Sequence, residues 1–117
     1  SSGVPTGAII ERDANGDGEY IKFADGTLIC WHTRTVSLAC TTALHGGFRT
    51  NGQVWTYPAN FVSAEVAVLV SVRDLTAFGA NAYPDSTTRC FWHATTITSE
   101  VVAADRTVSL MAIGRWF

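Results

Sequence analysis

The sequence predicts an all-β fold, namely an antiparallel β-sandwich of about six strands. Val, Ile and Thr make up 32 of the 117 residues, and these β-branched side chains fit a pleated, half-buried strand better than a helix. Hydrophobic residues reach 47% and charged residues only 15%, which supplies enough apolar material for one core. No convincing long helix interrupts the strand-like segments.

The N-terminal segment separates into a linker and the start of a domain. Residues 1–7 are rich in Gly, Ser and Pro, so we expect a linker from an upstream segment, followed by one domain over residues 8–117. Short strands are expected over 8–12 and 20–24, with a polar loop over 13–19 between them.

The pair Asp25-Gly26 predicts a hairpin into a long strand over 27–38, because Asp-Gly supplies the positive φ values that a tight turn needs. The first half of this strand is apolar on both faces, with Leu28 and Cys30 on one and Ile29 and Trp31 on the other. Such a strand is either central in the fold or covered on its outer face by a partner chain.

Four further strands complete the predicted sandwich, and they are expected over residues 54–57, 65–73, 89–98 and 107–117. The segment 65–73 is nearly continuously apolar and β-branched, which favours a buried strand over a helix. The intervening segments are predicted to be loops over 41–53 and 75–88, and one helical turn within 99–105.

Three segments resemble a known family. They read GAIIER at 7–12 followed by NGDGEYIKFADGTLICW at 15–31, WTYPANF at 55–61 followed by the apolar run 66–72, and LMAIGRW at 110–116. Together they cover about half of the chain, and they resemble the small C-terminal domain of bacteriophage and prophage tail fibres (the gp53-like type). The second segment also resembles the H-type lectin fold, in which an aromatic–Pro–Phe corner precedes a central strand.

The resemblance implies an H-type lectin-like sandwich that forms a homotrimer at the distal end of a fibre. Its expected partners are the upstream fibre segment and a host surface polysaccharide or lipopolysaccharide, and its expected location is the tail fibre tip of a virion assembled in the host cytoplasm. H-type lectins bind sugars in shallow sites between neighbouring protomers. The sugar-binding residues of the lectin are not transferred, because the segment 74–89 does not reproduce the lectin's acidic-to-Arg spacing.

Five residues that lie close together in the sequence form the candidate glycan site, and they are Tyr83, Asp85, Arg89, Trp92 and His93. A sugar site needs an aromatic face for the C–H side of the ring and polar groups for the hydroxyls, and this segment offers both. The long loop expected at 75–88 is the main candidate for recognition, because long loops in compact domains are often functional. For Trp92, a place in the core is the competing interpretation.

Metal and cofactor sites are not predicted. The loop from Asp13 to Gly18 alternates oxygen ligands with Gly like a calcium loop, but its twelfth position is Ala24 where a bidentate Glu is needed, so a plain polar turn is favoured. The three histidines lack a His-x-His pair. Cys30, Cys40 and Cys90 have no CxxC spacing, which leaves either three reduced thiols or one disulfide with one free thiol.

Charge and motif content exclude several function classes. A net charge of −2 argues against binding to nucleic acid or an anionic membrane, and no apolar run is long enough to insert into a bilayer. No nucleophile elbow, phosphate-binding loop or zinc-protease motif occurs, so no enzymatic activity is expected. The predicted function is therefore a receptor-binding domain of a phage tail fibre or related spike that binds a bacterial surface glycan without cleaving it. The alternatives are a trimerising cap without a ligand and a free-standing H-type lectin.

Overall fold

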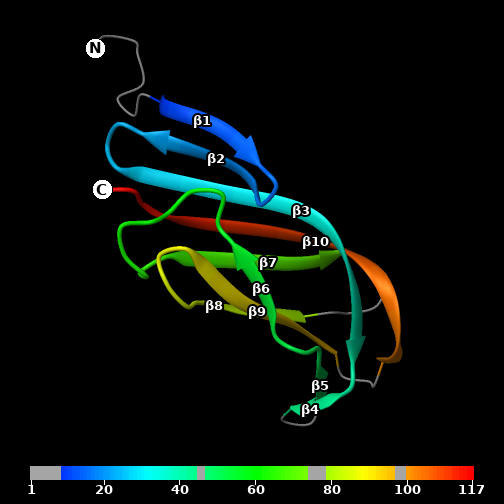
Figure 1. Ribbon diagram of the computed structural model, residues 1–117. Coiled ribbons are helices and arrows are strands. Elements are labelled where there is room, and N and C mark those ends of the chain that lie inside the picture. Colours follow the sequence, from blue (N-terminus) through cyan, green and yellow to red (C-terminus); the bar gives the residue numbers. More distant parts are fainter. Residues whose placement is uncertain (1–8, 45–46, 74–78, 97–99) are drawn as a thin grey trace.

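The computed structural model describes residues 9–44, 47–73, 79–96 and 100–117. These residues form ten strands and no helix, and the strands make two antiparallel sheets that pack against each other as a β-sandwich (Figure 1). Within the described part of the chain, no helix is long and apolar enough to cross a membrane. The predicted all-β sandwich is confirmed, and the predicted linker over 1–7 lies outside the described residues.

Sheet A has five strands in the order β1-β2-β3-β10-β7. Their bounds are Ile9–Asn15 for β1, Gly18–Phe23 for β2, Thr27–Cys40 for β3, Glu100–Arg115 for β10 and Ala67–Arg73 for β7. The two longest strands, β3 and β10, pair from Thr27 opposite Arg115 to Leu38 opposite Ala104 and form the centre of the sheet. The hairpin predicted at Asp25-Gly26 is confirmed, because β2 and β3 pair on either side of it.

Sheet B is built around one central strand. Its strands are β4 (Thr42–Leu44), β5 (Gly47–Arg49), β6 (Gln53–Thr56), β8 (Gly79–Pro84) and β9 (Arg89–Thr96). Strand β9 pairs with β8 along one edge and with both β5 and β6 along the other, so three separate parts of the chain meet on it. Figure 1 shows β6 crossing sheet A, and β8 and β9 lying next to β7.

The core lies between the two sheets. Its largest fully buried side chains are the indoles of Trp55 and Trp92 from sheet B, which face Leu28 and Val108 of sheet A. Burying a large apolar side chain stabilises a fold by roughly 1.5–3 kcal/mol, so these four account for a substantial share of the core.

All three cysteines are buried in this core. Burial raises the pKa of Cys30 to about 12 and that of Cys90 to about 11. The thiols of Cys30 and Cys40 lie 3.8 Å from the carbonyl oxygens of Ala59 and Ala94, to which they donate. Because a neutral thiol is a poor nucleophile, these side chains behave as small hydrophobic groups.

The first hairpin is tighter than the sequence predicts. Strand β1 ends at Asn15 and β2 begins at Gly18, so a two-residue turn takes the place of the loop expected over 13–19. The Asn15 side chain accepts a hydrogen bond from the Asp17 amide at 2.8 Å. Gly18 adopts φ 133°, and a Cβ there would lie 2.4 Å from the carbonyl oxygen of Trp31, so only glycine fits.

Among the described residues, no group of three or more His, Cys, Asp or Glu side chains could hold a metal.

Sheet pairing overrides several predictions made from local sequence. The segments expected to be loops contain β4 and β5 within 41–53 and β8 within 75–88, and the helical turn expected within 99–105 is part of β10. In each case a neighbouring strand supplies backbone partners that the local sequence does not reveal. The strand predicted over 65–73 is observed as β7, but it is not a buried strand as predicted. It is an edge strand whose side chains alternate between the core and solvent.

Candidate functional site on the outer face of sheet B

Strand β9 divides its side chains between the core and the outer surface of sheet B. Cys90, Trp92 and Ala94 point inward and are buried, whereas Arg89, Phe91 and His93 are partly or fully exposed on the opposite face. The predicted site included Trp92, and here the structure corrects it. The Trp92 side chain is only 1% exposed, because strand alternation places it between the sheets when its neighbours face outward.

The centre of the outer face is an apolar row across three strands, which we call the aromatic platform. Tyr83 of β8 and Val54 of β6 lie directly opposite Phe91 of β9 on its two sides. The rings of Tyr83 and Phe91 are 5.6 Å apart between centroids and tilted by 43°. Tyr83 is 57% exposed and Val54 is 40% exposed. The platform therefore presents ring surface to solvent.

An arginine is fixed beside this platform by the turn that joins β8 to β9. The backbone amides of Asp85 and Ser86 both donate to the carbonyl oxygen of Arg89 at 3.2 Å. The Arg89 Nε atom donates to Asp85 Oδ2 at 2.9 Å, which forms a salt bridge. The guanidinium carbon lies 5.1 Å from the centroid of the Phe91 ring, within the range of a cation–π contact. Arg89 is thus held in one orientation and keeps further N–H donors for a ligand.

On its other side the platform is bordered by polar groups. His93 follows Phe91 on the same face of β9, and Asn81 of β8 lies opposite it. Burial lowers the pKa of His93, and the nearby charge of Arg49 lowers it further. The imidazole is therefore mainly neutral at pH 7, with one nitrogen that donates and one that accepts a hydrogen bond.

Four of the five predicted site residues, Tyr83, Asp85, Arg89 and His93, come together on this face. Sequence reasoning missed Phe91, although a usable signal was present. Side chains alternate along a strand, so Phe91 had to share a face with Arg89 and His93, whereas Trp92 had to point the other way. Sequence reasoning also missed Val54, which reaches the platform only through the pairing of β6 with β9. The arrangement offers an aromatic surface with donors on both sides, which suits the binding of a polar molecule that has one apolar face.

Comparison with known proteins identifies two solved structures with a similar fold. One is an N-truncated R1-type pyocin tail fibre, at 22% identity and a TM-score of 0.59, and the match covers 90% of this chain and 86% of that one. The other is a C-terminal fragment of the R1 pyocin fibre of P. aeruginosa, at 18% identity and a TM-score of 0.55. That match covers 90% of this chain but only 28% of the fragment.

No family model matches the sequence, and no curated protein matches it. The shared fold covers 90% of this chain in both matches. The β-sandwich of this chain is therefore similar in fold to these two fibre structures.

Proposed function

We propose that this chain is a receptor-binding domain of a phage tail fibre or a related particle spike, and that it binds a glycan of the host bacterial surface without cleaving it. The observation that carries the proposal is the aromatic platform of Val54, Phe91 and Tyr83, with Arg89 fixed beside it. The fold that the chain shares with two R1 pyocin fibre structures supports the same assignment.

The platform has the chemistry that a sugar ring requires. The exposed ring of Tyr83 would stack on the C–H face of a sugar, and Arg89, His93 and Asn81 would hydrogen-bond its hydroxyl groups. Because Asp85 already orients the guanidinium, a ligand would not have to immobilise that side chain on binding. The Asp85 carboxylate is engaged in this pair, so the proposal includes no catalytic step.

Binding at one such open site is expected to be weak, because it buries little area. In the proposed assembly the chain is a homotrimer attached to an upstream fibre segment, and three sites would act together on a polysaccharide or lipopolysaccharide with repeating units. We place this assembly at the tail fibre tip of a virion formed in the host cytoplasm. Three buried cysteines agree with a reducing compartment.

A glycan array combined with adsorption to intact host cells tests the proposal. We expect binding to a bacterial surface glycan, and we expect Tyr83→Ala to weaken it roughly tenfold, as loss of a ring contact of about 1.4 kcal/mol would. Val62→Ala is the matched control, because Val62 is equally exposed at 57% but lies in the segment between β6 and β7. Equal losses in both variants would contradict the proposed site.

A trimerising cap without a ligand is the second candidate, and the exposed side chains of Leu69, Met111 and Ile113 on sheet A favour it. Absence of binding to every sugar and to host cells by a correctly assembled protein would support the cap and overturn glycan binding. A free-standing H-type lectin would instead bind the glycan without an upstream fibre segment.

A further inference from the structure

The outer face of sheet A, which points away from the core, carries a continuous apolar surface. The strand registers align two rows of side chains across it: Ile21, Ile29, Ile113 and Ala67 in one row, and Trp31, Met111 and Leu69 in the next. The second row ends on β2 at Glu19, which accepts a hydrogen bond from the Trp31 indole at 3.0 Å. We call the six large side chains of these rows the apolar patch, namely Ile21, Ile29, Trp31, Leu69, Met111 and Ile113.

The patch is open to solvent in the isolated chain. Leu69 is 61% exposed, Met111 38% and Ile113 37%. None of the six members carries a charge. Soluble monomers rarely expose a contiguous apolar surface of this kind without a function, so the patch indicates an interface.

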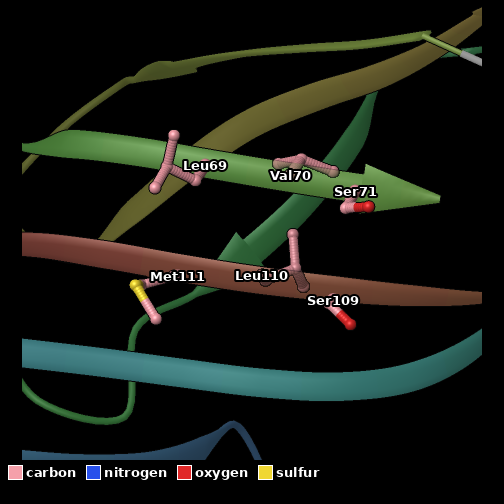
Figure 2. Close-up of a pocket in the computed structure, with 6 residues that line it drawn as sticks. All are labelled: Leu69, Val70, Ser71, Ser109, Leu110 and Met111. Atoms are coloured by element: carbon pink, nitrogen blue, oxygen red, sulfur yellow. The ribbon is translucent and has the colours of Figure 1, made fainter.

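A hollow lies at the end of the patch, where β7 and β10 run side by side (Figure 2). It has a volume of about 360 Å³, and its outer wall is formed by Leu69, Met111, Ser71 and Ser109. Leu69 is the most exposed of these side chains and also borders the hollow. Apolar side chains of a second copy that packs on this face can therefore fill the hollow and cover Leu69.

The next row of the face is small and hydroxylated, and the row after it includes the exposed Arg73 of β7. Thr33, Ser109 and Ser71 are aligned across β3, β10 and β7. The three strands stay in register over the seven positions of β7, so the face measures roughly 24 Å along the strands, at about 3.4 Å per residue. Strand β2 pairs with β3 only over Glu19–Lys22, so β1 and β2 widen the face at one end, and the flat footprint is on the order of 500 Å². This is somewhat over half of the ~800 Å² that each partner contributes to a standard interface.

The ends of the domain are placed suitably for a bundle of identical chains. Strand β1 begins at Ile9 opposite Phe23, and β10 ends at Arg115 opposite Thr27, so both lie beside the same turn between β2 and β3 (Figure 1). The patch lies at this same end of sheet A. Copies packed through the patch about a common axis would therefore all start at one end, as chains of one fibre must.

We propose that the outer face of sheet A is the surface through which copies of this chain associate, burying the apolar patch and leaving the aromatic platform of sheet B on the outside. The occupant of the patch is thus a second copy of the chain. The number of copies, three, rests on the proposed function. The assignment of the surface rests on the apolar patch.

Light scattering after size-exclusion chromatography tests the surface at micromolar concentration. The unmodified chain should have the mass of three chains, and Leu69→Glu should reduce it threefold to that of one chain. Val54→Glu is the control, because Val54 is also an exposed apolar side chain but lies on the outer face of sheet B; the mass of this variant should be that of the unmodified chain. Far-UV circular dichroism should show the same strand content in all three proteins.

A second readout follows Trp31, which belongs to the patch and is only half-buried in one chain. Iodide should quench its fluorescence more strongly in Leu69→Glu than in Val54→Glu. The proposal would be overturned if the unmodified chain were monomeric. It would also be overturned if Val54→Glu dissociated the assembly and Leu69→Glu did not. A two-chain mass that Leu69→Glu abolishes would support the surface and contradict the trimer of the proposed function. Loss of glycan binding with an intact assembly would contradict only that function.

Discussion

The two outer faces of this sandwich expose large side chains to a similar degree but surround them differently. Leu69 and Met111 on sheet A have apolar or hydroxylated neighbours. Tyr83 on sheet B contacts Phe91, which is itself covered by the Arg89 guanidinium. Exposure alone does not distinguish the two faces. The two faces are distinguished by the polar groups beside the exposed side chains, and these groups indicate what each face can bind.

This difference has a thermodynamic meaning. Apolar side chains without polar neighbours are stabilised by complete burial, and such a contact loses no hydrogen bonds to water. A face that carries Arg89, Asp85 and His93 must exchange water for other polar partners, so it suits an open, reversible contact with a polar ligand. Sheet A is accordingly suited to permanent association and sheet B to recognition.

The largest expected effect separates the platform from the core directly beneath it. Trp92→Ala should destabilise the fold by about 3–5 kcal/mol, because it removes a buried indole from between the sheets. Chemical denaturation measures this free energy of unfolding. Tyr83→Ala should change it by less than about 1 kcal/mol, as expected for an exposed side chain. A Trp92→Ala protein of normal stability that fails to bind glycan would reverse this assignment of the two residues.

A smaller effect is expected when the orienting carboxylate of the platform is removed. Asp85→Asn should lower glycan affinity by roughly two- to tenfold, because the ligand must then immobilise the Arg89 side chain itself. Stability should fall by no more than about 1 kcal/mol, as is usual for a surface ion pair. Asp105→Asn, at an exposed carboxylate of β10, is the control. Titration of both proteins with the glycan found on the array compares them, and equal affinities would show that the ion pair has no role in binding.

The smallest expected effect is a pH dependence of stability at His93. Its pKa is lower in the folded chain than the usual 6.5, so the unfolded chain takes up a proton at higher pH than the folded chain does. Stability should therefore decrease as the pH falls below about 6.5 and through the folded pKa. Melting temperatures between neutral and mildly acidic pH should fall more steeply for the unmodified chain than for His93→Gln. Parallel curves would show that His93 is as well solvated as in the unfolded chain.

Local sequence was informative where it determined backbone geometry. The Asp25-Gly26 turn places β2 against β3, and Gly26 adopts the positive φ of 99° that the pattern predicts. It was misleading where a strand forms mainly because a partner is present. The residues of β8 have small side chains and turn-forming types, yet they pair with β9 over their whole length. A sheet edge that lacks backbone partners can recruit such a segment despite its weak strand propensity.

The linear pattern was sufficient to show that the strand over 27–38 is apolar on both sides, which is the origin of the apolar patch. Alternation along a strand also requires Phe91 and Trp92 to face in opposite directions, which the predicted site, with Trp92 beside Arg89 and His93, did not take into account. Only the packing of sheet B on sheet A determined whether Phe91 or Trp92 is inside. The same packing brought Val54 and Tyr83 to the two sides of Phe91 from distant parts of the chain. Alternation is a local property of the backbone, whereas the buried face is the one that a second sheet covers.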